Sequence, residues 1–156
     1  MKLKLALFAL VLATACAKKT NAVYYTYKTQ CMSLELDGSQ TLLSWGNGKD
    51  RADAVEQAKK NAISDVLFNG ILEGKAGCNV KPLVPEVNAR DKYDDYFNKF
   101  FADGGPYTAY LNLIDEKSHS REKKASNYSA TYSVTVRVLQ PQLKERLIAD
   151  GILKQP

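Results

Sequence analysis

The order of apolar and polar residues changes its period along this chain, and each change predicts a new element. The clearest alternation, with a period of two, runs through residues 128–139. Its apolar positions are Tyr128, Ala130, Tyr132, Val134, Val136 and Val138. We therefore predict a strand there with one buried face and one solvent-exposed face. Residues 107–114 predict a further strand, and the charged residues 115–127 predict a long hairpin loop or two frayed strand ends.

Two shorter alternating segments near the start of the chain predict a hairpin. Residues 27–37 alternate methionine and leucine with serine and glutamate, and residues 41–45 form the second strand. The Asp-Gly pair at 37–38 is a turn signal between them. The Gly-Asn-Gly run at 46–48 then predicts the end of the second strand.

Helical spacing appears in three other segments. Asp50 is a good N-cap for a helix that frays at Gly70, and its apolar stripe consists of Val55, Ala58, Ala62, Val66 and Leu67. The small alanine side chains predict that this helix lies close against a sheet. Residues 87–102 predict a second helix with an aromatic stripe, and Pro141 predicts the start of a short third one.

The element order is therefore β-β-α-(α)-β-β-α, with residues 74–85 expected as irregular loop. This order predicts an α+β fold: an antiparallel or mixed four-stranded sheet with helices packed on one face. The chain has 156 residues, of which 45% are hydrophobic and 25% charged. These values fit one globular domain, which we place at residues 23–156.

The first fifteen residues differ from the rest and predict export. Lys2 and Lys4 precede an unbroken apolar run at 5–12, and small residues follow at 13–15. The run is too short to span a bilayer, which takes about 20 apolar residues. It is typical of the central region of a cleaved signal peptide. We therefore assign residues 1–15 to a signal peptide and exclude them from the fold.

Cys16 follows these small residues directly. The segment from Ala13 to Cys16 resembles a bacterial lipobox, although such boxes usually carry leucine where Ala13 stands. The resemblance implies that Cys16 carries acyl chains such as palmitate. It also implies that residues 16–22 form a lipidated tether to the bilayer. Several acyl chains give near-permanent anchoring. No acidic residue follows Cys16 immediately, which by known sorting rules implies an outer-membrane, periplasm-facing lipoprotein. A plain secreted protein is the alternative.

Charge and cysteine content narrow the function classes. Without Lys2 and Lys4, the 22 basic residues become 20 against 17 acidic ones, and the net charge of +5 becomes +3. That excess is too small to predict a nucleic-acid partner. With three cysteines and one histidine, we expect no metal site and no cofactor. Cys31 and Cys78 are a disulfide candidate in an oxidising compartment, and two unpaired buried thiols are the alternative.

Part of the chain resembles a known group of proteins. The residues that carry the resemblance are Trp45-Gly46-Asn47-Gly48, then Ala52, Ala54, Ala58 and Ala62, then 132–139 and 143–152. They are similar to the small outer-membrane lipoproteins whose domain also forms the N-terminal part of the flagellar T-ring protein. The resemblance implies a non-enzymatic role in the envelope and supplies no catalytic residues.

Two groups of residues are candidates for contacts. Lys117, Arg121, Lys123 and Lys124 form a basic cluster that would meet an anionic surface, with a solvated loop tip as the alternative. An aromatic pocket for a small anionic or glycan ligand would consist of Tyr93, Tyr96, Phe97 and Phe100. We find no nucleophile, base or metal set and therefore predict no enzyme. The expected function is binding of another envelope protein, or of a second copy, through an exposed sheet edge.

Overall fold

A computed structural model describes residues 28–75, 77–124 and 127–154, and for 118–124 and 127–129 it describes the backbone. Within these residues the strands are β1 (Gln30–Leu34), β2 (Gln40–Gly48), β3 (Glu73–Gly74), β4 (Leu111–Lys124) and β5 (Asn127–Val138). They form one sheet in the order β3-β1-β2-β5-β4. β1 and β3 are parallel and the other pairs antiparallel. The predicted α+β class with a mixed sheet is confirmed, with β3 as a strand beyond the predicted four.

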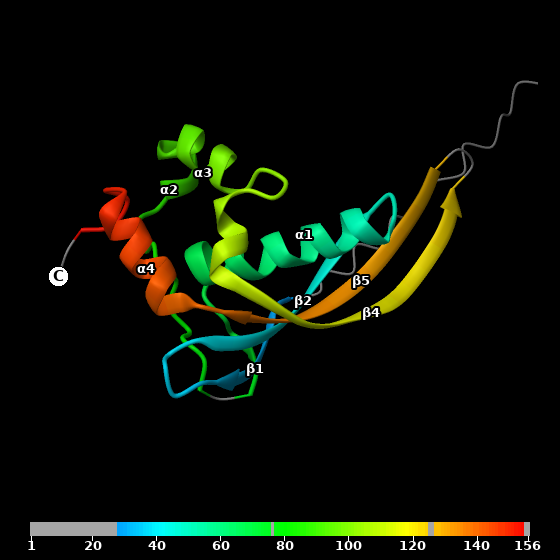
Figure 1. The fold of residues 1–156 in the computed structure, drawn as a ribbon, viewed down its shortest axis with the longest axis horizontal. Helices are drawn as coiled ribbons and strands as arrows, with labels where there is room; N and C mark the ends of the chain where they lie inside the picture. Colours follow the sequence, from blue (N-terminus) through cyan, green and yellow to red (C-terminus); the bar gives the residue numbers. More distant parts are fainter. Residues whose placement is uncertain (1–27, 76, 125–126, 155–156) are drawn as a thin grey trace, which may run out of the picture.

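Helix α1 (Arg51–Ser64) lies across one face of the sheet and against β2 and β5 (Figure 1). Its predicted N-cap is confirmed, because the Asp50 side chain accepts a hydrogen bond of 3.0 Å from the Asp53 amide. A π-helical turn, η1 (Asp65–Asn69), continues the helix to Gly70, whose φ of 73° ends it. All five apolar residues of the predicted stripe are buried.

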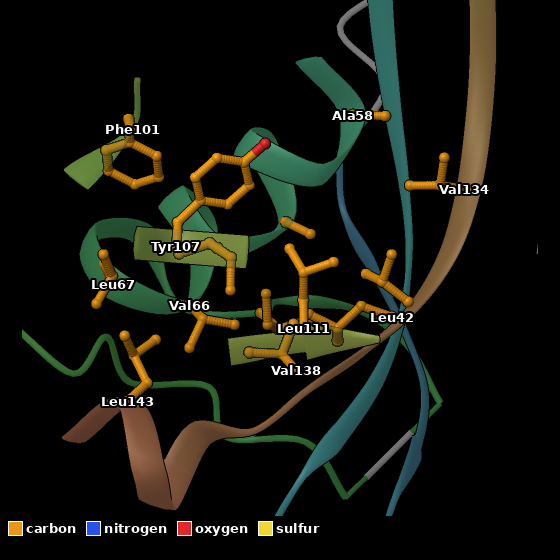
Figure 2. Packing of buried hydrophobic residues seen from close by; sticks show 14 of the residues in the cluster. Leu42, Ala58, Val66, Leu67, Phe101, Tyr107, Leu111, Val134, Val138 and Leu143 are labelled. Atoms are coloured by element: carbon orange, nitrogen blue, oxygen red, sulfur yellow. The ribbon is translucent and has the colours of Figure 1, made fainter. Parts of the chain in front are cut away.

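The core lies between α1 and the sheet. Val134, Val136 and Val138 of β5 are fully buried, as is Leu42 of β2. Figure 2 shows Leu42, Val134 and Val138 on the side of the sheet that carries α1. The apolar face predicted for residues 128–139 is therefore confirmed from Ala130 onward, and the side chain of Tyr128 lies outside the described part. The opposite face is not exposed throughout, because Ser133 is buried as well.

β2 continues through the Gly-Asn-Gly run, so the prediction that it ends at 45 is wrong. Gly46 and Gly48 lie on the face that α1 covers. A Cβ atom on Gly48 would lie 2.4 Å from the Ala54 amide nitrogen. The glycines therefore make room for the helix instead of breaking the strand.

A second helical layer covers the outer side of α1 (Figure 1). The single helix predicted at 87–102 is in fact two short ones, α2 (Ala89–Lys92) and α3 (Asp94–Phe100), with Tyr93 between them at φ −113° and ψ 37°. A 3-10 turn, η2 (Pro106–Tyr110), replaces the predicted start of a strand at 107. Helix α4 (Gln140–Ala149) starts with Pro141 near its N-terminus, as predicted, and buries Leu143 and Leu147.

β1 departs from its predicted alternation. The register shifts between Cys31 and Ser33, and Leu34 is 46% exposed. Cys31 is buried instead, and its Sγ lies 2.03 Å from the Sγ of Cys78, at disulfide distance. The bond ties the segment after β3 to β1, and the Lys75 amide donates to the Cys31 carbonyl at 2.9 Å.

Candidate functional site

The long hairpin of β4 and β5 is the most prominent surface feature of the fold. Residues 115–127 were expected as a hairpin loop or frayed strand ends; in the structure, paired strands run to Lys124 and resume at Asn127. The hairpin projects beyond the start of α1 (Figure 1). Among the described residues, only β5 pairs with β4, so the fourteen residues of β4 form a sheet edge. Such an edge presents backbone donors and acceptors to solvent.

Two irregularities interrupt this edge. The β4–β5 register shifts between Leu113 and Asp115 and again between Ser118 and Ser120. The first shift leaves Leu113 and Ile114 exposed by 46% and 58%. A bulge twists an edge and limits indiscriminate pairing. The edge thus combines free backbone groups with two apolar side chains at one defined place.

The predicted basic cluster lies on this strand and not on a loop. Lys117, Arg121, Lys123 and Lys124 all belong to β4. The Lys117 side chain is 74% exposed and lies 4.0 Å from Asp115. The side chains of the other three lie outside the described part. The neighbouring Glu116 forms an ion pair with Arg51 of α1, which ties the base of the hairpin to the helix.

The predicted aromatic pocket is wrong for Phe97 and Phe100, because both rings are core residues, exposed by 0% and 2%. They belong to an aromatic cluster in which Phe68 and Phe97 have centroids 4.9 Å apart. Tyr93 and Tyr96 are half-buried. The Tyr96 hydroxyl donates to Asp150 at 2.7 Å, and its pKa is raised by burial and by that carboxylate. The aromatic stripe therefore joins α3 to the core and to α4.

Two hollows flank Arg90, one between α1 and α3 and the other between the end of α1, η1 and the segment that leads into α2. One has a volume of about 270 Å³ and is lined mainly by polar groups, among them Gln57, Lys60 and Asn98. The other, of about 360 Å³, is lined by Phe68, Pro82, Pro85 and neighbouring residues. Both are lined by Ser64 and Arg90. Arg90 carries no sequence signal of its own, since a single arginine in a polar segment is usually a solvated residue, and sequence analysis missed it.

Two polar clusters inside the fold have structural roles. The buried amides of Gln40 and Gln140 are hydrogen-bonded to each other, and Asn79 Nδ2 donates to the same Gln140 oxygen at 2.5 Å. The Tyr107 hydroxyl donates to Glu56. Burial opposes ionisation of Glu56, but hydrogen bonds from Lys59 and Tyr107 outweigh it and lower its pKa.

Cys16 and residues 1–15 lie outside the described part of the chain. Within the described ranges, no helix has the length and apolarity needed to cross a bilayer. The same ranges contain no group of three His, Cys, Asp or Glu residues placed to hold a metal ion. No protein-family model, curated protein or solved structure matches the chain.

Proposed function

We propose that this protein is a lipid-anchored bacterial envelope protein that works by binding, with β4 as its docking edge. A strand of the partner, which is another envelope protein or a second copy, adds to β4 by β-augmentation. Backbone hydrogen bonds would supply the affinity of such a contact, and side-chain pockets its specificity. The role is non-enzymatic, and the protein faces the periplasm from the outer membrane.

The observation that carries the proposal is the difference between the two ends of the sheet. At one end, the two-residue β3 covers β1 and is held there by the Cys31–Cys78 pair. At the other end, β4 extends over fourteen residues with no described strand beyond it. Leu113 and Ile114 add exposed apolar surface at this end. A partner strand therefore finds both main-chain groups and an apolar contact at β4.

The anchor and the compartment rest on the sequence. The run from Lys2 to Ala15 supports export, and Cys16 supports acylation. A cysteine pair at bonding distance suits an oxidising compartment. The likeness to outer-membrane lipoproteins that share the T-ring protein domain supports a role in envelope assembly.

Site-specific photo-crosslinking in intact cells tests the docking edge. A photoreactive phenylalanine analogue replaces Ile114 at the edge in one variant and Val87 in the other, which is exposed by 84% in the segment before α2. We expect a discrete crosslinked product from position 114 and none from position 87. Equal crosslinking at both positions, or a product from position 87 alone, would contradict the proposed edge.

A further inference from the structure

We propose that the two hollows flanking Arg90 form one binding groove for a small acidic sugar, whose carboxylate pairs with the Arg90 guanidinium. This site lies between α1 and η1 on one side and the segment from Pro82 to Phe101 on the other, and it is distinct from the β4 edge. It does not depend on the docking function, so either proposal can fail alone.

The groove has the dimensions of a small-ligand site. Its polar hollow measures about 270 Å³ and its second hollow about 360 Å³. Ligand sites in proteins usually start at about 300 Å³, a volume that the second hollow exceeds and that the polar hollow reaches only together with it. Because Arg90 and Ser64 line both hollows, a ligand held at Arg90 can extend to either side.

The charge of the polar hollow favours an anion. Lys60 and Arg90 line it, and none of its described lining residues carries a carboxylate. The Lys60 Nζ atom is already paired with Asp103 Oδ1 at 2.5 Å, and the Asp103 side chain is 90% exposed at the rim of the hollow. Arg90 forms no ion pair with any described carboxylate. In the second hollow, the carboxylate of Glu86 is paired with Lys92 at 2.7 Å, so it does not neutralise Arg90.

Arg90 is held in a position suited to carboxylate recognition. Its guanidinium carbon lies 5.4 Å from the centroid of the Phe101 ring, within the range of a cation–π contact. A planar guanidinium held against an aromatic ring loses less conformational freedom on binding than an unrestrained arginine side chain. It can bind a carboxylate with two parallel hydrogen bonds. The aromatic contact thus orients a charge that has no described partner of its own.

Neutral polar groups on the walls favour a hydroxylated ligand. On α1, Gln57 Nε2 donates to Asn61 Oδ1 at 2.8 Å, and Asn61 Nδ2 donates to the Trp45 carbonyl at 2.8 Å. These two bonds fix the Asn61 amide and leave the Gln57 carbonyl oxygen as an acceptor for a ligand hydroxyl. Asn98 lies on the opposite wall. Guanidinium and amides together suit a carboxylate on a hydroxyl-bearing ring.

NMR titration of the ¹⁵N-labelled full chain tests this assignment, with D-glucuronate as the probe. Three comparison probes separate its features: D-glucose lacks the charge, acetate lacks the sugar ring, and glucose 6-phosphate carries a phosphate in place of the carboxylate. We expect glucuronate to bind at least about tenfold more tightly than each of the other three. The amide signals that shift should cluster in the two segments that line the groove, residues 57–69 and 82–101.

Three variants locate the charge. Arg90→Gln should weaken glucuronate binding by about tenfold or more, and Arg90→Lys should keep only part of the affinity because lysine cannot form the paired hydrogen bonds. Lys144→Gln, an exposed lysine of α4, removes the same charge elsewhere and should leave binding unchanged. Equal binding of glucose or acetate, tighter binding of the phosphate, unchanged binding by Arg90→Gln, or shifts outside the two segments would each overturn the proposal.

Discussion

Gly46 of β2 lies directly against the backbone of Ala58 in α1: a Cβ atom on Gly46 would lie 2.3 Å from the Ala58 amide nitrogen. It would also lie 2.2 Å from the Ala54 carbonyl oxygen. Both contacts are with backbone, so no side chain can move aside. The helix therefore rests on a strand that has no side chain at this point, and α1 is as close to the sheet as its own main chain allows.

The first prediction follows from this contact. Gly46→Ala should lower the free energy of unfolding by about 3 kcal/mol or more, since overpacking against backbone forces the helix away from the sheet. Urea denaturation of the purified protein measures the change. Gly104→Ala is the matched control: its Cβ would meet nothing within 4 Å, and the cost of its positive φ of 66° is about 1 kcal/mol. Equal losses in both variants would contradict the close packing.

The hydrogen bond between Tyr107 and Glu56 leads to a second prediction. Tyr107→Phe removes a donor to a partly buried carboxylate and should cost about 1–2 kcal/mol of stability. The pKa of Glu56 should rise in this variant, because that donor helps to lower it. Chemical denaturation measures the first effect and a ¹³C NMR titration the second. A double-mutant cycle with Glu56→Gln should give a coupling of about 1 kcal/mol; zero coupling would contradict the bond.

The β1–β2 turn leads to a prediction about pH. Hydrogen bonds from the Ser39 hydroxyl and amide, helped by Arg137, lower the pKa of Asp37 from 3.8 to about 2. A lowered carboxyl pKa stabilises the folded state above pH 3.8, and this contribution is lost as the pH falls from there to about 2. An NMR titration of the Asp37 carboxyl should therefore show a midpoint near 2.

The same turn provides its own control. In Asp37→Asn the acid-dependent loss of stability between pH 3.8 and about 2 should become smaller, while the stability at pH 7 falls because the ion pair with Arg137 is gone. A midpoint at the ordinary value of 3.8 in the wild type would contradict the hydrogen-bonded turn.

The Cys31–Cys78 pair leads to a fourth prediction. The two residues are 47 positions apart, and closing a loop of that length stabilises a folded protein by about 4 kcal/mol in the chain-entropy view. The double variant Cys31→Ser, Cys78→Ser should lose stability of that order. A thiol reductant should lower the melting temperature of the wild type and leave that of the double variant unchanged. A reductant effect of equal size on both proteins would show that it acts elsewhere.

The sequence predicts those elements whose residue pattern reflects their packing. Three predicted features agree with the structure: the apolar positions up to Val138, the N-cap at Asp50 and the alanine stripe of α1. Each of them directly reflects a buried face or a helix end. β3 was missed because two residues have no period, and its place depends on a cysteine pair distant in sequence. The sequence leaves the extension of β4 open between a loop and frayed strand ends, because residues 115–124 are polar throughout and pair because β5 lies beside them.

The candidate sites were harder to predict for a related physical reason. The aromatic stripe of α3 marks a buried face, and a buried face and a ligand pocket produce the same spacing of residues, so Phe97 and Phe100 were assigned to the wrong one. Arg90 belongs to the proposed groove only because it lies beside residues of α1, such as Ser64 and Asn61. These residues are far from Arg90 in the sequence. No local pattern contains that information.

The anchor gives the final prediction, which concerns Cys16. If the cysteine is acylated, cells grown with radioactive or clickable palmitate should label the wild-type protein strongly, and Cys16→Ser should lose the label because serine offers no thiol. The wild type should also fractionate with membranes, since several acyl chains at about 0.8 kcal/mol per buried methylene hold a protein on a bilayer. Cys31→Ser is the control for a cysteine inside the fold and should keep the label. Equal labelling of the wild type and Cys16→Ser would contradict the anchor.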